Sequence, residues 1–242
     1  MTLSAFIRLG VCVLLALSGT ALADPVPLSQ TYGFYGITTN SAESKAAGEA
    51  QLFVTVSNYY LNLNGMPANL ANTFLADNQV LFTFTNTGPK ASVIAQIYFE
   101  GGPLSGIHSF VHNAGIAFGI GATPPVLPGG ENLSPPFNVD ISASATNPAP
   151  HNGVNPGEWL GIVVNLEGTH TYEDVIAALA LDSDHPLRIG LHVTSFANEE
   201  SEAFVNIPPT PPGPRSVAPA PGAAVLAFVG LGLVAHVRRK LV

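Results

Sequence analysis

Short β-rich runs, each ended by glycine or proline, recur through the middle of this chain and limit every element there to a few residues. Residues 51–57, QLFVTVS, place Leu52, Val54 and Val56 on one face, which is the two-residue period of a half-buried strand. Residues 187–194 alternate in the same way. With 24 glycines and 21 prolines to separate such runs, the pattern predicts a mainly β fold, an antiparallel β-sandwich or jelly roll with one short helix.

The clearest local prediction is a β-hairpin. Residues 79–86 and 92–99 are rich in β-branched and aromatic side chains, and a five-residue linker with glycine and proline separates them, so we expect the two runs to pair.

Two long connections are also expected. Residues 58–78 hold an Asn-Gly turn signal and are predicted to be a long loop or a weak helical turn. Residues 121–157 hold eight prolines and are predicted to be a surface excursion.

Helical character is expected at two places. Residues 40–48 are mostly small and polar, with Gly48 placed to end a turn. Thr171 and Asp174 have the spacing of a capping box, and an apolar face follows them. This second pattern predicts an amphipathic helix of about ten residues before Pro186.

The N-terminal segment has the layout of a secretory signal. A positive charge precedes an apolar run, and Ala21 and Ala23 supply the small residues that a signal peptidase needs. Residues 1–23 are therefore predicted to be removed by that enzyme before Asp24. The chain's one cysteine, Cys12, lies inside this segment. The mature chain thus has no thiol, and we expect no disulfide and no cysteine-based metal or catalytic site in it.

The C-terminal segment has the layout of a membrane anchor. Residues 220–237 are apolar and rich in small side chains, and as a helix rising about 1.5 Å per residue they come close to the roughly 30 Å of a bilayer core. Arg238, Arg239 and Lys240 follow and are expected to stay on the cytoplasmic side of the membrane. The proline-rich residues 208–216 are predicted to form an extended linker to a folded domain at 24–207.

Residues 217–242 resemble the PEP-CTERM sorting signal of exported bacterial proteins, which joins a Pro-Glu-Pro-like motif, a membrane helix and a basic tail. Pro219, Ala220 and Pro221 fall on the motif, with Ala220 where the family usually has glutamate. The resemblance implies an exosortase-like sorting enzyme as partner, transient anchoring in the inner membrane, a final place at the cell surface or outside the cell, and exopolysaccharide as a further partner. Residues 31–207, with stretches such as YGFYGITTN and VLFTFTNTG, are similar to uncharacterised ectodomains that precede this signal, which implies a shared fold and no established activity.

The exported part of the chain is strongly acidic. All 16 acidic residues lie between residues 24 and 202, whereas the cations outside the two targeting segments are only Lys45, Lys90, Arg188 and Arg215. A field of that sign repels nucleic acid. We therefore expect no nucleic-acid partner.

Residues that could carry chemistry form few patterns. His108 and His112 stand four apart, but their neighbours favour strand or loop, where that spacing gives no tight zinc chelate. Asp182 and Asp184 supply hard oxygen ligands suited to calcium. No glycine turn and no downstream glutamate completes a calcium loop, so no metal site is assigned, and the alternative is that these carboxylates are solvated at the end of the helix. The acidic turn at 199–202 is expected to be solvated. Because the sequence has no serine-nucleophile elbow and marks no carboxylate pair, no catalytic or cofactor-binding residue is assigned.

These observations predict an exported structural or matrix-associated protein without enzymatic activity or cofactor. Two alternatives stay open: a carbohydrate-binding module or carbohydrate-active enzyme of the cell envelope, and a calcium-dependent adhesin. The first requires clustered acids or exposed aromatic side chains in one cleft, for which Tyr59, Tyr60 and Trp159 are the candidates. The second requires that chelation lowers the melting temperature.

Overall fold

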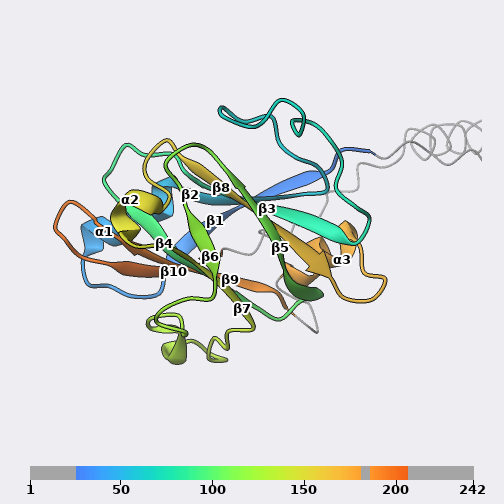
Figure 1. Cartoon of the computed structure of the whole chain (residues 1–242). Helices are drawn as coiled ribbons and strands as arrows, with labels where there is room; N and C mark the ends of the chain where they lie inside the picture. Colours follow the sequence, from blue (N-terminus) through green and yellow to red (C-terminus); the bar gives the residue numbers. More distant parts are fainter. Residues whose placement is uncertain (1–25, 181–185, 207–242) are drawn as a thin grey trace, which may run out of the picture.

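The computed structural model describes residues 26–180 and 186–206 (Figure 1). Within these residues the chain has ten antiparallel strands and a few short helices, which confirms the expected mainly β class. The strands are β1 (Ser29–Gly36), β2 (Leu52–Ser57), β3 (Gln79–Asn86), β4 (Val93–Glu100), β5 (Leu104–His112), β6 (Phe118–Ile120), β7 (Ile141–Ala145), β8 (Trp159–Leu166), β9 (Arg188–Thr194) and β10 (Glu202–Asn206). The helices are α1 (Ala42–Gln51), α2 (Ala149–Asn152), α3 (Tyr172–Ala178) and the 3-10 helix η1 (Gly130–Asn132).

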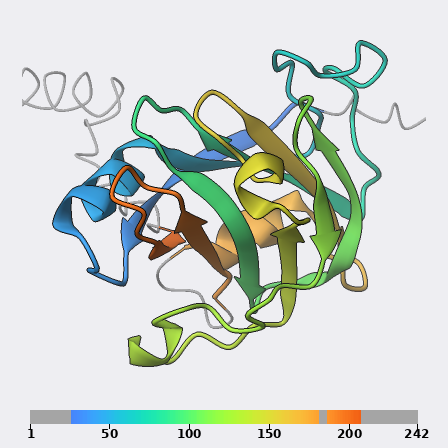
Figure 2. The same cartoon turned by 60° about the vertical axis from the view of Figure 1, so that its left-hand side comes forward.

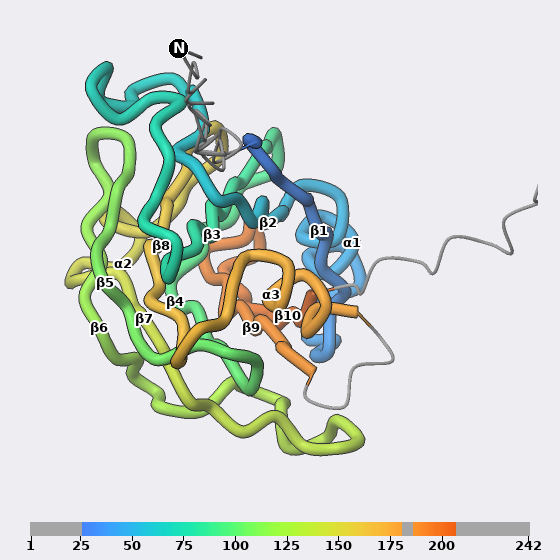
Figure 3. The backbone as a smooth tube through the Cα atoms, turned by 90° about the vertical axis from the view of Figure 1, so that its right-hand side faces the viewer, coloured from blue at the N-terminus to red at the C-terminus, as the bar shows by residue number. Residues whose placement is uncertain are grey.

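The ten strands form one continuous sheet, and β1 joins its two halves. The order is β5-β8-β3-β2-β1-β10-β9-β4-β7-β6. The first part of β1 pairs with β2, as at Tyr32 and Val54, whereas its end pairs with β10, as at Phe34 and Asn206. We call the strands from β5 to β1 half A and those from β10 to β6 half B; Figures 2 and 3 show them wrapped around a common interior. The two outermost strands, β5 and β6, follow one another in the chain, so the sheet is nearly closed.

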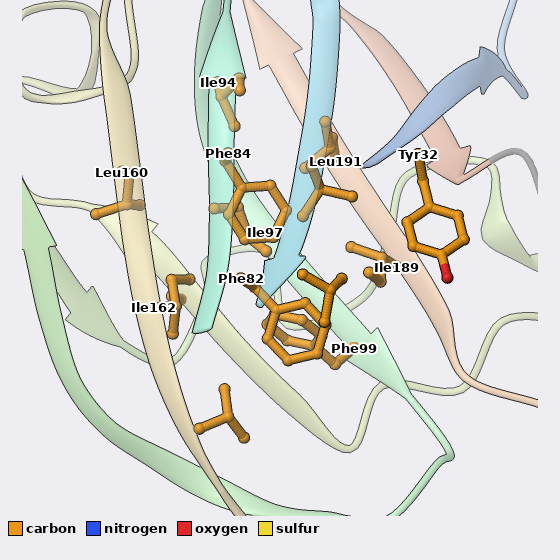
Figure 4. Packing of buried hydrophobic residues seen from close by; sticks show 14 of the residues in the cluster. Tyr32, Phe82, Phe84, Ile94, Ile97, Phe99, Leu160, Ile162, Ile189 and Leu191 are labelled. Carbon is orange, nitrogen blue, oxygen red and sulfur yellow. The ribbon is translucent and has the colours of Figure 1, made fainter. Parts of the chain in front are cut away.

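Aromatic rings from both halves meet in the interior (Figure 4). Phe82 and Phe84 of β3 and Phe99 of β4 are fully buried. The ring of Phe99 meets both others edge to face, with centroids 5.0 Å from Phe82 and 6.1 Å from Phe84. Such pairs contribute about 0.5–1.5 kcal/mol each beyond the burial of the rings. The core therefore lies between β3 of half A and β4 of half B and holds the two halves together.

The predicted hairpin between residues 79–86 and 92–99 is wrong. β3 pairs with β2 and β8 in half A, and β4 pairs with β7 and β9 in half B, so the linker between them crosses from one half to the other. The side chain of Gln51 holds this linker in place. Its amide accepts a hydrogen bond from Lys90 N–H at 3.1 Å and donates one to Lys90 O at 2.8 Å. Since both strands are buried on both faces, their own sequences do not indicate which neighbours they take.

The first long connection, residues 58–78, confirms the predicted loop and folds back on itself as a flap against half A. Its two arms are joined by backbone hydrogen bonds, such as Tyr60 N to Thr73 O at 2.9 Å. At its tip, Asn64 O accepts a 2.8 Å hydrogen bond from the indole N–H of Trp159. The flap is the teal loop at the top of Figure 3.

The second long connection contains a cover loop, residues 121–140, which lies against half B. Its Leu127 and Phe137 pack on Tyr98 of β4 in a second, smaller apolar cluster, and the Tyr98 hydroxyl donates to Pro124 O at 3.0 Å. The flap and the cover loop together explain why β4 and β8 are buried along nearly their whole length. A strand with one face in water would alternate between buried and exposed residues instead.

The helices lie near the predicted places, with one correction. α3 begins after Thr171, whose backbone N–H donates to Asp174 Oδ2 at 2.8 Å, and it is shorter than expected, at seven residues. α1 continues past Gly48 to Gln51, so the prediction that Gly48 ends a turn is wrong. Gly48 instead lets the helix lie close to β10, because a Cβ at this position would be 2.1 Å from Cζ of Phe204.

Candidate functional site

The sorting and processing residues predicted from the sequence lie outside the described residues. They are Ala21, Ala23 and Asp24 at the signal-peptide cleavage point, the motif Pro219, Ala220 and Pro221, and the basic tail Arg238, Arg239 and Lys240. The calcium candidates Asp182 and Asp184 lie outside as well. In the part of the chain that is described, no helix combines the length and the apolar character needed to span a membrane. The roles assigned to all these residues stay predictions.

The two histidines considered for zinc lie on a strand, as expected. His108 and His112 belong to β5; His108 is exposed, and Nδ1 of the half-buried His112 is 2.9 Å from Asn113 O. Over residues 26–180 and 186–206, no three His, Cys, Asp or Glu side chains are placed to hold one metal ion. Within those ranges the histidine pair therefore lacks the further ligands of a zinc site.

Two of the three aromatic side chains considered for sugar binding are used in packing. Trp159 is 5% exposed, and its indole N–H is bound by Asn64 O. Tyr59 pairs with Phe74 across the two arms of the flap, with ring centroids 6.4 Å apart. Neither of them, nor Tyr60, lines the cleft described next.

The candidate site is a cleft of about 750 Å³ between α3 and the ends of β4 and β9. Four carboxylates line it, together with one histidine and one arginine: Glu100, Asp140, Glu167, Asp174, His170 and Arg188. The sequence did not mark this group, because its members come from four segments that are distant in the chain. Only the fold brings them together.

Arg188 fastens the cover loop to the sheet. Its Nε donates to Glu100 Oε2 at 2.5 Å, and both side chains are largely buried. Its Nη1 and Nη2 donate to Pro135 O at 2.9 Å and Pro136 O at 2.6 Å, and the guanidinium lies over the ring of Phe137, 5.2 Å from its centroid. All three guanidinium nitrogens thus have protein acceptors, and the charge of Glu100 is neutralised.

A tight turn after β4 shapes one wall of the cleft. Gly101 and Gly102 have φ angles of 70° and 68°, and Asp140 Oδ2 accepts a hydrogen bond from Gly101 N–H at 2.7 Å. A Cβ at Gly101 would lie 2.4 Å from Pro186 O, so this position requires glycine both for its left-handed backbone and for space. The turn therefore fixes the place of Asp140 at the cleft.

Another wall carries a carboxylate beside a histidine. Asp174 Oδ2 is 3.3 Å from His170 Nδ1 and accepts the backbone N–H of Thr171. That backbone hydrogen bond, assisted by His170, holds the pKa of Asp174 below its usual range. Glu167, on the same connection between β8 and α3, is exposed. A cleft lined in this way suits cations or basic groups.

The carboxylate of Glu202 is buried, which the sequence did not indicate. The acidic turn at 199–202 is expected to be solvated, and for Glu202 this is wrong, because its side chain is 1% exposed. Its Oε1 accepts Ser41 N–H at 2.6 Å and its Oε2 accepts the Thr38 hydroxyl, so it satisfies polar groups at the start of α1. No local signal marks it, since these partners lie 161 and 164 residues earlier in the chain.

Comparison of the chain with protein-family models, with curated proteins and with solved structures finds no match. A functional conclusion for this chain therefore depends on its sequence and on the geometry described above.

Proposed function

We propose that this chain is an exported protein of the cell surface or extracellular matrix with a structural role, and not an enzyme. The signal peptide at 1–23 directs it across the inner membrane. The segment at 217–242 holds it there until an exosortase-like enzyme sorts it. The ectodomain at 24–207 is an antiparallel β-sandwich of jelly-roll type, which the packing of half A on half B supports, and its partner outside the cell is exopolysaccharide.

The observation that supports a structural role is that polar side chains able to bind a ligand instead form hydrogen bonds to loops of the domain itself. The Trp159 indole binds the tip of the flap, and Arg188 binds the cover loop. A binding or catalytic domain would instead keep such groups free in its cleft, where a ligand can meet them. The arrangement supports a domain that persists outside the cell without the help of disulfides.

The positions of the first and last strands support an anchored ectodomain. β1 and β10 are antiparallel neighbours, with Phe34 opposite Asn206. The first and last strands of the described part therefore lie side by side. Their proximity suits a domain that is held at a membrane and released by a single cut.

Intact mass and cell fractionation of the protein from its native host test the sorting proposal. We expect a species that begins at Asp24, ends near residues 217–221 and lies outside the inner membrane. Ala220→Glu, which restores the usual motif, should raise the processed fraction, whereas replacing the three cations at 238–240 by glutamine should lower it. An unprocessed mature chain that stays in the inner membrane in both the natural and the Ala220→Glu forms would overturn the proposal.

A calcium-dependent adhesin is the second candidate, and the acidic cleft favours it. Ala178 and Pro186 line this cleft beside the carboxylates, and in the sequence they flank the segment that holds Asp182 and Asp184. Calcium bound there would stabilise the folded state by mass action, so EDTA should lower the melting temperature of the full chain and added calcium should restore it. An unchanged melt removes this candidate, whereas an equal EDTA effect in the Asp182→Asn, Asp184→Asn double variant places the calcium at other ligands.

A further inference from the structure

Two Asn-Gly pairs occur in the sequence, Asn64-Gly65 and Asn152-Gly153. In such a pair the backbone nitrogen of the glycine can attack Cγ of the asparagine side chain, since glycine has no Cβ to hinder the approach. The reaction needs a glycine N–H without a hydrogen bond and an asparagine side chain that is able to turn. The two sites differ in both respects.

The Asn64-Gly65 pair lies exposed at the tip of the flap. It forms the centre of a turn that Met66 N closes on Leu63 O at 3.0 Å, and Gly65 has a φ of 84°. Among the described residues, neither the side-chain amide of Asn64 nor the N–H of Gly65 finds a hydrogen-bond partner. The two reacting groups are therefore in water and able to move toward each other.

The Asn152-Gly153 pair is fixed at the end of α2. Asn152 Nδ2 donates to Thr146 O at 3.1 Å and to Thr146 Oγ1 at 3.0 Å, and Gly153 N–H donates to Ala149 O at 2.8 Å. Gly153 is buried, and a Cβ there would lie 2.4 Å from Val93 Cγ1. Attack at this site requires local opening of the structure first.

We propose that Asn64 is a site of spontaneous deamidation and that Asn152 is protected from it. Gly65 N loses its proton and bonds to Cγ of Asn64, and the side-chain nitrogen leaves as ammonia, which gives a five-membered succinimide. One water then opens the ring. Attack at the side-chain carbonyl gives aspartate, and attack at the main-chain carbonyl gives isoaspartate, whose backbone is longer by one methylene group.

The modification changes the attachment of the flap. Asn64 O is the acceptor for the Trp159 indole at 2.8 Å, and in the isoaspartate product this carbonyl becomes part of a free carboxylate while the backbone runs through the former side chain. Both products add a negative charge beside Trp159. Because Trp159 is the only tryptophan of the chain, its fluorescence reports the change.

Incubation of the full chain, kept soluble in a mild detergent, in mildly alkaline heavy-oxygen water tests the proposal. Trypsin cleaves after Lys45, Lys90 and Arg188, so the two sites fall in separate peptides, and mass spectrometry locates the incorporated oxygen. In the folded chain Asn64 should react at least about tenfold faster than Asn152, because only Asn152 must wait for opening. In urea the ratio should fall to within about twofold, since both sites are then equally open.

The variant Asn64→Gln provides the matched control, because it keeps the backbone carbonyl that holds Trp159 but closes the corresponding larger ring far more slowly. It should show no incorporation at position 64 and no drift of the Trp159 emission during incubation. Equal rates at Asn64 and Asn152 in the folded chain overturn the proposal. An Asn64 that reacts in urea but not in the folded chain overturns it as well.

Discussion

Replacing Gln51 by leucine tests the contact that lets the chain cross from half A to half B. Gln51 ends α1 and is 2% exposed. Its Nε2 lies 3.0 Å from Asn86 Oδ1, 2.8 Å from Lys90 O and 2.7 Å from Ser92 Oγ, and its Oε1 accepts Lys90 N–H at 3.1 Å. Leucine has a similar size but makes none of these bonds.

The magnitude follows from the number of bonds that one amide can make. Nε2 has two hydrogens for its three acceptors, so together with the bond at Oε1 about three hydrogen bonds are lost. At roughly 1 kcal/mol each, Gln51→Leu should lower the free energy of unfolding by about 3 kcal/mol, and no larger loss is expected because Asn86 Oδ1 keeps its hydrogen bond from Gly88 N–H at 3.2 Å.

Urea unfolding followed by the fluorescence of Trp159 measures this change. Gln79→Leu is the matched control, because Gln79 is half-buried and its side chain donates one hydrogen bond, to Asn165 Oδ1 at 3.0 Å. It should cost about 1 kcal/mol. If Gln51→Leu costs no more than Gln79→Leu, the side-chain amide does not hold the linker that crosses between the two halves, and this reasoning is refuted.

Other contacts of the domain give outcomes that the same methods can measure. Arg188→Met should lower the free energy of unfolding by about 3 kcal/mol, because Glu100 is left buried without its partner, and a second change, Glu100→Gln, should restore part of the loss. Burial lowers the pKa of His192 from its ordinary 6.5, so the unfolded chain takes up a proton first as the pH falls, and the melting temperature should decrease below about pH 6.5 in the natural chain and less in His192→Gln. Gly48→Ala should cost about 1–3 kcal/mol through overpacking, whereas Gly119→Ala, whose added Cβ meets open space, should leave the urea midpoint unchanged.

Features that depend on neighbouring residues could be predicted from the sequence. The two-residue period of β2 appears as alternating burial of Leu52, Val54 and Val56, and Thr171 and Asp174 form the predicted cap of α3. The flap also lies where its turn signal indicated. In each case the residues that interact are close in the chain, so a local pattern contains the information.

Features that depend on distant residues could not be predicted. The hairpin signal at 79–99 was locally complete, but β3 and β4 are buried on both faces, and such strands pair equally well with several neighbours. Which strands become neighbours in the sheet depends on how all ten strands pack together, and no single pair of strands determines it. Glu202 shows the same limit for a single side chain, because nothing near it in the sequence indicates the start of α1 as its partner.

The same dependence on distant residues explains why side chains that could bind a ligand proved to have structural contacts. A sheet that is apolar on both faces must have its outer face covered by loops. Without disulfides, such loops are held in place by side-chain hydrogen bonds. In this domain the side chains that hold the covering loops include the only tryptophan of the chain and one of the few cations among residues 24–207, Trp159 and Arg188. The hydrogen bonds that hold a loop are chemically the same as those that hold a ligand, so composition cannot separate the two uses. Alanine substitutions at these positions would lower stability and any binding together, and only variants that keep the hydrogen bond to the loop, such as Asn64→Gln, can separate function from folding at these surfaces.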